Sequence, residues 1–211
     1  MKTKFAFVLA AFIVAFASCQ KDKNDDTDNG GTTTDYQPTS VGSTWQYNST
    51  SQGVYTETAV SGDTTIEGDK YYIFDNTENG RRYVNKNNGN YTSYGYVAQL
   101  DTAVKLLYLK DAAAGTSWTN TALYSGIPVT LTYNIASRDA SMTVNNKNFD
   151  NVIGLTFTVG APNPITGQNI TIATGKQFYA KGVGSIMSTL HLKVQTVDIN
   201  DSTYLVSYDI K

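Results

Sequence analysis

The stretch Val129-Thr130-Leu131-Thr132-Tyr133-Asn134-Ile135 alternates apolar and polar side chains without a break. Because successive side chains of a β-strand point to opposite faces, this period of two predicts a strand with one buried face. Leu190-His191-Leu192-Lys193-Val194-Gln195 repeats the alternation near the end of the chain. Both segments indicate that the body of the protein is built from half-buried strands.

Turn dipeptides recur between such segments at the spacing typical of all-β folds. Asn79-Gly80 and Asn88-Gly89 accept the positive φ angles of two-residue hairpin turns, and Asn145-Asn146 and Asn200-Asp201 are predicted to do the same. Val104–Leu109 precedes an alanine run that could extend a helix, and we favour a strand. The prediction is an all-β domain, an antiparallel meander that forms a curved sheet, a partial barrel or a sandwich.

Two G-x-x-W tetrapeptides suggest that the domain consists of two related halves, 36–110 and 111–211. They are Gly42-Ser43-Thr44-Trp45 and Gly115-Thr116-Ser117-Trp118, and each precedes a Thr-rich strand. The match between the halves needs gaps and covers about half of each copy, so chance similarity stays open.

Composition excludes several classes of protein. The chain of 211 residues has a net charge of −2, which argues against a nucleic-acid binder with its basic stripe. One cysteine and one histidine cannot form a disulfide framework or a Cys/His zinc cage, and we expect no metal and no cofactor. The length suffices for one domain with its own core, to which Trp45, Trp118 and Phe178-Tyr179 should contribute.

The N-terminus carries an export signal. Lys2 and Lys4 precede the apolar run Phe5–Ala17, whose 13 residues would span about 20 Å as a helix. That is short of the ~30 Å hydrocarbon core of a membrane and is typical of a signal peptide, which we place at residues 1–18.

The only cysteine, Cys19, directly follows Phe16-Ala17-Ser18. This arrangement resembles the lipobox of bacterial lipoproteins, whose cysteine is diacylated and becomes the first residue after cleavage. Phe16 stands where leucine is usual, which resembles the looser lipobox of Bacteroidetes. The resemblance implies that Cys19 is the lipidation site, and two acyl chains suffice for stable anchoring. A secretory signal with an incidental cysteine is the alternative.

Residues 19–35 are acidic and nearly free of apolar side chains, which predicts a disordered tether. A calcium loop is the alternative, but the glutamate that would be its bidentate ligand is missing. Gln20-Lys21-Asp22 resembles the signal that exports Bacteroidetes lipoproteins to the outer leaflet. The resemblance implies an outer-membrane lipoprotein facing the cell exterior, with residues 36–211 as a single domain.

Two further motifs resemble small, uncharacterised outer-membrane lipoproteins of Bacteroidetes. Tyr36-Gln37-Pro38-Thr39-Ser40-Val41-Gly42-Ser43-Thr44-Trp45-Gln46-Tyr47 is similar to their Y-x-P-x-x-V-G-x-x-W-x-Y opening, and Gln177–Gly184 to a late F-x-A-x-G-V-G segment. The next residues, Ser185-Ile186-Met187, depart from the Leu-Val-Lys of many relatives. The resemblance implies a location and an all-β fold but no reaction.

No catalytic constellation is visible in the sequence. His191 shares a strand face with Lys193, which predicts a solvated position. The three glutamates, Glu57, Glu67 and Glu78, are expected at the surface, and nothing brings two carboxylates together as a glycosidase requires. We therefore expect a protein that is not an enzyme.

Tyrosines are in excess, with 15 in the chain. Tyr83, Tyr91, Tyr94 and Tyr96 gather in one predicted hairpin and are the candidate ligand-binding residues. Apolar sugar faces stack on such rings while neighbouring amides bind hydroxyls. Alternatively, tyrosine serves only as a good strand former, and Tyr83 and Tyr91 form a cross-strand pair.

The functional hypothesis is a lipid-anchored cell-surface protein with a non-catalytic binding or structural role. Its partners would be the membrane, through the lipid anchor, and a glycan or another surface protein. A glycosidase-like surface enzyme and a lipid or lipoprotein carrier with an apolar cavity are the alternatives.

Overall fold

The computed structural model describes residues 34–97, 102–124, 127–163, 166–194 and 196–211. The predicted signal peptide, Cys19 and the tether up to residue 33 lie outside these ranges. The described residues contain no helix long and apolar enough to cross a membrane. They form twelve strands: β1 (Thr44–Ser49), β2 (Gly53–Ile66), β3 (Asp69–Asn76), β4 (Gly80–Asn87), β5 (Asn90–Val97), β6 (Thr102–Lys110), β7 (Ser117–Tyr124), β8 (Ile127–Val144), β9 (Lys147–Pro162), β10 (Asn169–Ala180), β11 (Gly184–Val194) and β12 (Val197–Asp209).

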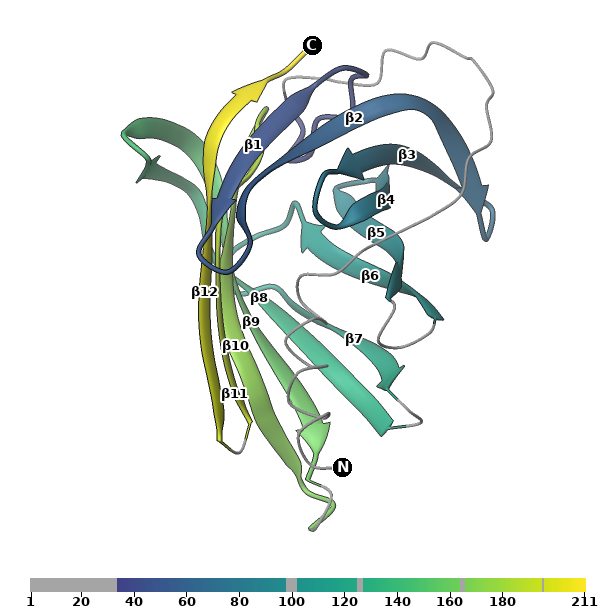
Figure 1. The fold of residues 1–211 in the computed structure, drawn as a ribbon, viewed down its shortest axis with the longest axis vertical. Coiled ribbons are helices and arrows are strands. Elements are labelled where there is room, and N and C mark those ends of the chain that lie inside the picture. The colour runs from purple at the N-terminus through teal and green to yellow at the C-terminus, as the bar shows by residue number, and fades with distance from the viewer. Residues whose placement is uncertain (1–33, 98–101, 125–126, 164–165, 195) are drawn as a thin grey trace.

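All twelve strands belong to one antiparallel sheet in the order β6-β5-β4-β3-β2-β1-β12-β11-β10-β9-β8-β7. The sheet curves into a nearly closed, barrel-like shape, with the long strands β8 to β12 on one side (Figure 1). Strands β6 and β7 are consecutive in the chain, yet they lie at the two edges of the sheet. The all-β meander is confirmed, and among the three predicted shapes the structure is closest to a barrel.

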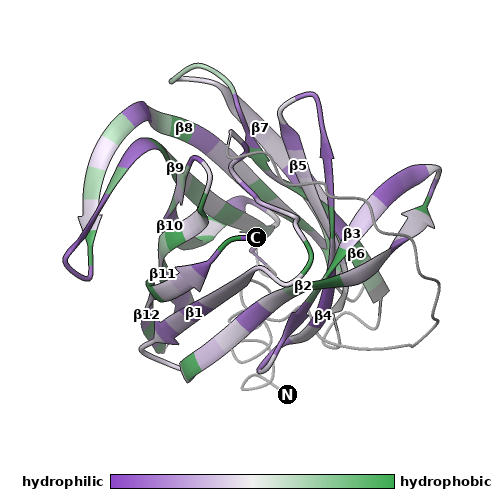
Figure 2. Ribbon diagram, turned by 90° about the horizontal axis from the view of Figure 1, so that it is seen from above, coloured by the Kyte–Doolittle hydropathy of each residue, from purple (hydrophilic) through white to green (hydrophobic). Residues whose placement is uncertain are grey.

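The alternating segments bury the side chains that their pattern predicts. Val129, Leu131, Tyr133 and Ile135 are buried, and the polar residues between them are partly exposed. Three strands away in the same sheet, Leu190 and Leu192 are buried on β11. Seen from above, the strands curve around the middle of the molecule (Figure 2).

The two tryptophans and Tyr179 also lie in the core, and Phe178 packs against it. Each tryptophan stands near the start of a strand, Trp45 on β1 and Trp118 on β7. The predicted contribution of these residues to the core is confirmed.

Two of the four predicted turns are confirmed, one lies at the predicted place with a different length, and one is wrong. Asn88-Gly89 and Asn145-Asn146 have positive φ at both residues, as a two-residue turn between right-twisted strands requires. Asn79-Gly80 lies at the turn between β3 and β4, and Gly80 has positive φ, but the loop has three residues, 77–79, because Asn76 pairs with Gly80. Asn200-Asp201 lies inside β12, opposite His191 and Leu190 on β11.

The contacts of Asp201 explain why Asn200-Asp201 does not form the predicted turn. Its buried carboxylate accepts hydrogen bonds from the Ser49 and Thr50 hydroxyls and from the Ser51 backbone N–H. The aspartate therefore fixes the β1–β2 turn from within a neighbouring strand.

The sheet consists of two meanders of six strands each, β1 to β6 and β7 to β12, which are joined by the pairing of β1 with β12. Both meanders begin with the G-x-x-W tetrapeptide and its strand, and both have a long second strand, β2 and β8. The relatedness of the two halves in sequence stays a prediction.

Candidate functional site

A part-enclosed cavity of about 210 Å³ lies inside the curved sheet. Its apolar wall consists mainly of aromatic rings from both meanders. These are Tyr47, Tyr55, Tyr108, Tyr133, Phe157 and Tyr179. Several of the rings touch one another, as Tyr108 and Tyr179 do with centroids 6.0 Å apart, so the wall is a preformed surface.

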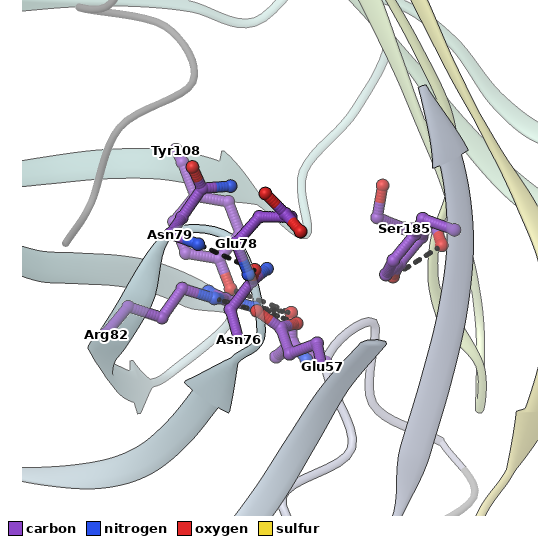
Figure 3. A network of polar contacts seen from close by, with 9 residues as sticks. Glu57, Asn76, Glu78, Asn79, Arg82, Tyr108 and Ser185 are labelled. Atoms are coloured by element: carbon purple, nitrogen blue, oxygen red, sulfur yellow. Dashed lines mark hydrogen bonds and ion pairs between the residues drawn. The ribbon is translucent and has the colours of Figure 1, made fainter. Parts of the chain in front are cut away.

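The polar wall is centred on a buried ion pair between Glu57 on β2 and Arg82 on β4. Arg82 Nε donates to Glu57 Oε1 over 2.6 Å, and Arg82 Nη2 donates to Glu57 Oε2 over 2.7 Å (Figure 3). The guanidinium also lies 4.8 Å from the centroid of the Phe74 ring. This two-point contact and the ring hold Arg82 in one orientation.

The prediction that Glu57 lies at the surface is therefore wrong, since its exposed fraction is 5%. Its strand is rich in threonine and looks solvated in sequence. Its partner Arg82 is 25 residues away and two strands across the sheet, so only the register of three strands reveals the pair.

Burial and neighbouring charges shift the pKa values of Arg82 and Tyr55. Desolvation alone would lower the pKa of the Arg82 guanidinium, but the Glu57 carboxylate outweighs it and holds that pKa above its ordinary value. Burial, and then the nearby Glu57 charge, raises the pKa of the Tyr55 phenol to about 12. The cavity thus presents one fixed ion pair surrounded by neutral phenols.

Residues 35–40, here called the closing segment, seal one end of the cavity. The Gly182 N–H donates to the Asp35 carbonyl over 2.7 Å, and the Tyr36 N–H donates to the Tyr91 hydroxyl over 3.1 Å. The next side chain, Gln37, is 3% exposed and lines the cavity.

Gln37 connects the closing segment to the polar wall. Its Oε1 accepts from Arg82 Nη2 at 3.4 Å and from the Tyr108 hydroxyl at 3.3 Å. Gln37 belongs to the first of the two motifs that resemble Bacteroidetes lipoproteins, which begins at Tyr36. Trp45 of the same motif donates a hydrogen bond from Nε1 to the carbonyl of Val183, in the second motif, over 2.6 Å. The two motifs therefore meet at the sealed end.

A second cavity of about 120 Å³ continues the first one away from the closing segment. Both are lined by Tyr55, Asn79, Phe157, Gln177, Ser188 and Thr203, so they form one continuous space. Asp201 and Gln52 border its far part. There Gln52 Nε2 donates to Asn79 Oδ1 over 3.3 Å, which joins the β1–β2 turn to the β3–β4 loop.

The four tyrosines selected from the sequence do not share one surface. Tyr91 is buried, and its pKa is raised to about 12, mainly by that burial. Tyr83 and Tyr94 are partly exposed and pair with each other across β4 and β5, whereas Tyr91 lies opposite Lys86. The predicted Tyr83–Tyr91 pair is therefore wrong. Tyr96 lies on β5, and its side chain is outside the described part of the structure.

The other candidate residues lie outside this cavity. His191 is exposed on β11, as predicted, with its Nε2 3.0 Å from Asp198 Oδ1. Glu67 and Glu78 are exposed. Sequence reasoning missed Gln37, Arg82 and Tyr108. The signals that they carried were the position of Arg82 and Tyr108 within strands and that of Gln37 directly after the motif residue Tyr36.

Two solved structures resemble the whole sheet. One is described as a putative lipoprotein from Parabacteroides distasonis, at 15% identity and a TM-score of 0.50, covering 83% of this chain and 99% of that one. The other is described as a putative exported protein with a YmcC-like fold from Bacteroides fragilis, at 10% identity and a TM-score of 0.50, covering 82% and 97%. This chain shares their fold.

At such identities the likeness extends to the fold alone. No protein-family model matches the chain. No curated protein matches it either.

Proposed function

We propose that this chain is a lipid-anchored protein of the outer membrane, facing the cell exterior, that binds a saccharide non-catalytically inside its barrel-like sheet. The observation that carries the proposal is the composition of the cavity wall. Aromatic rings face a fixed Glu57–Arg82 pair across a space of about 210 Å³. Sites for small molecules combine such apolar walls with a few well-placed polar groups.

A sugar fits both kinds of wall. The C–H face of a pyranose stacks on a ring, and each hydroxyl both donates and accepts a hydrogen bond. Arg82 supplies donors, Glu57 supplies acceptors, and the amides of Gln37 and Gln177 supply both. The pair has no net charge, which favours a neutral polar ligand over an ion.

The polarity of the cavity argues against the lipid-carrier alternative. A carrier needs an apolar space of several hundred Å³, whereas this wall contains an ion pair, amides and hydroxyls. A buried ion pair would lose its polar surroundings against an acyl chain, at a high cost in free energy.

The location rests on the export signal, the single cysteine and the acidic segment after it. The two structural neighbours, described as a lipoprotein and an exported protein, support a place in the cell envelope. Anchoring through Cys19 would present the sheet at the membrane surface.

A glycan array with the purified full-length chain tests the binding. We expect a bound glycan to be lost in Ser188→Leu, which fills the cavity, and kept in Thr174→Leu, an exposed position of the neighbouring strand. The variant Tyr83→Ala/Tyr94→Ala, on the opposite side of the sheet from the cavity lining, should also bind. Loss of binding only in the tyrosine variant would contradict an internal site and favour the outer tyrosine surface.

An enzyme is the second candidate, because two buried carboxylates, Glu57 and Asp201, border the same continuous space. Both are held by other groups: Glu57 by Arg82, and Asp201 by Ser49, Thr50 and Ser51. We therefore favour binding. Release of reducing ends from a bound glycan, lost in Glu57→Gln or Asp201→Asn, would replace the binding role by hydrolysis.

A further inference from the structure

The cavity has one sealed end, and this limits which part of a ligand can enter. The closing segment crosses that end, with Tyr36 fully buried and Gln37 3% exposed. The segment is fixed on two sides, by the Gly182 N–H bond to Asp35 and by the Lys86–Asp35 ion pair at 2.5 Å. At the far part of the space, Gln52 and Asn79 border the second cavity, where the β1–β2 turn meets the β3–β4 loop.

Polar side chains form a connected network at the sealed end. Gln37 of the closing segment contacts both Arg82 and Tyr108, and Arg82 holds Glu57. Donors and acceptors are thus present where an entering ligand would stop. Rings such as Tyr55 and Phe157, which line both cavities, extend the wall toward the far end.

We infer that the site takes a glycan end-on, with one terminal sugar unit seated against Gln37, Arg82 and Glu57. This inference rests on the proposed saccharide binding. A chain-internal unit has a neighbour on each side and needs a groove open at both ends. The sealed end admits no second neighbour beyond the unit that is seated against it. The chemical class of ligand is therefore a free monosaccharide or disaccharide, or the terminal unit of a longer glycan.

The test compares chain ends with chain interiors. Full-length protein is applied to a glycan array, and each bound glycan is then measured in solution by calorimetry beside the methyl glycoside of its terminal unit. We expect the methyl glycoside to bind within about fivefold of the whole glycan, because units beyond the first contribute few contacts. Removal of the terminal unit by an exoglycosidase should abolish binding.

Matched variants connect that result to the cavity. Ser188→Leu should weaken binding of the methyl glycoside at least tenfold, and Thr174→Leu should leave it unchanged. Affinity that rises steadily with chain length, or binding of cyclic glycans, which have no ends, would overturn end-on entry while keeping saccharide binding. Failure to bind any saccharide, with the fold intact by circular dichroism, would overturn the proposed function itself.

Discussion

Asn120 on β7 binds both backbone groups of Leu107 on β6. The Leu107 N–H donates to Asn120 Oδ1 over 3.0 Å, and Asn120 Nδ2 donates back to the Leu107 carbonyl over 3.1 Å. The Trp118 indole N–H adds a third bond, to the same carbonyl, at 2.7 Å. The side-chain amide of Asn120 thus takes the place of the backbone peptide group that would pair two neighbouring strands. Asn120 and Trp118 together join the two edges of the sheet.

Removing that amide should weaken the junction of β6 and β7. Asn120→Ala leaves the Leu107 N–H without its partner, and we expect a loss of about 1–3 kcal/mol in the free energy of unfolding. Urea denaturation measures it. Asn134→Ala, which removes an exposed bond to the Ser117 hydroxyl, should cost about 0.5 kcal/mol or less. Equal losses in the two variants would contradict a special role for Asn120.

Removing one partner of the Glu57–Arg82 ion pair should strongly lower the free energy of unfolding. Removing both partners should lower it by less than the sum of the two single losses. Arg82→Met leaves a buried carboxylate alone, with an expected loss of about 3–5 kcal/mol. The double variant Glu57→Gln/Arg82→Met should lose less than the sum of the single losses, because neither charge is then stranded. Urea denaturation of all three variants closes the cycle. Additive losses would mean that the two side chains act independently.

Alkaline pH should destabilise the protein through its buried phenols. The pKa of Tyr91 is about 12 in the folded state and ordinarily about 10 in an unfolded chain. The unfolded state therefore releases its proton first, so stability is complete below about pH 9 and falls as the pH rises from 10 to 12. One phenol with such a shift contributes at most about 2–3 kcal/mol to the free energy of unfolding.

The variant Tyr91→Phe tests whether ionisation of Tyr91 causes the loss of stability at alkaline pH. Its free energy of unfolding should decline less steeply than that of the wild type between pH 9 and 11.5. The variant also lacks the acceptor for the Tyr36 N–H, so it starts from a lower stability, and only the slope is compared. Identical slopes would assign the alkaline transition to other groups.

Metabolic labelling with a palmitate analogue tests the lipid anchor. We expect the wild type and Ser18→Ala to be labelled and to sediment with membranes, and Cys19→Ala to be unlabelled, because Cys19 is the only cysteine in the chain. Label on the Cys19→Ala protein would contradict the lipobox.

The features that follow from neighbouring residues could be predicted from the sequence. The strand at Val129–Ile135 is visible in its own alternation, and Asn88-Gly89 specifies its turn through the φ angles that both residues tolerate. The candidate site could not be predicted in this way. Glu57 and Arg82 meet only because three strands pair in one register, and Gln37 reaches them from outside the strands.

Asp201 shows the same limit in a different form. An Asn-Asp dipeptide favours a turn locally, yet the hydrogen bonds that this aspartate makes to residues 150 or more positions away keep it inside a strand. Long-range contacts outweigh local preference at this position.

The pairing of β1 with β12 has a consequence for how the chain folds. Trp45 lies opposite Tyr208, so the contact that joins the two meanders links residues near the two ends of the domain. Such a contact carries a large loop-closure entropy and raises the contact order, which slows folding. While the chain is being synthesised or exported, the first six strands can pair with one another, but β1 has an open edge until the last strand arrives. An exposed edge is prone to pair with other chains, so the C-terminal strand is the one whose delay or loss should promote aggregation.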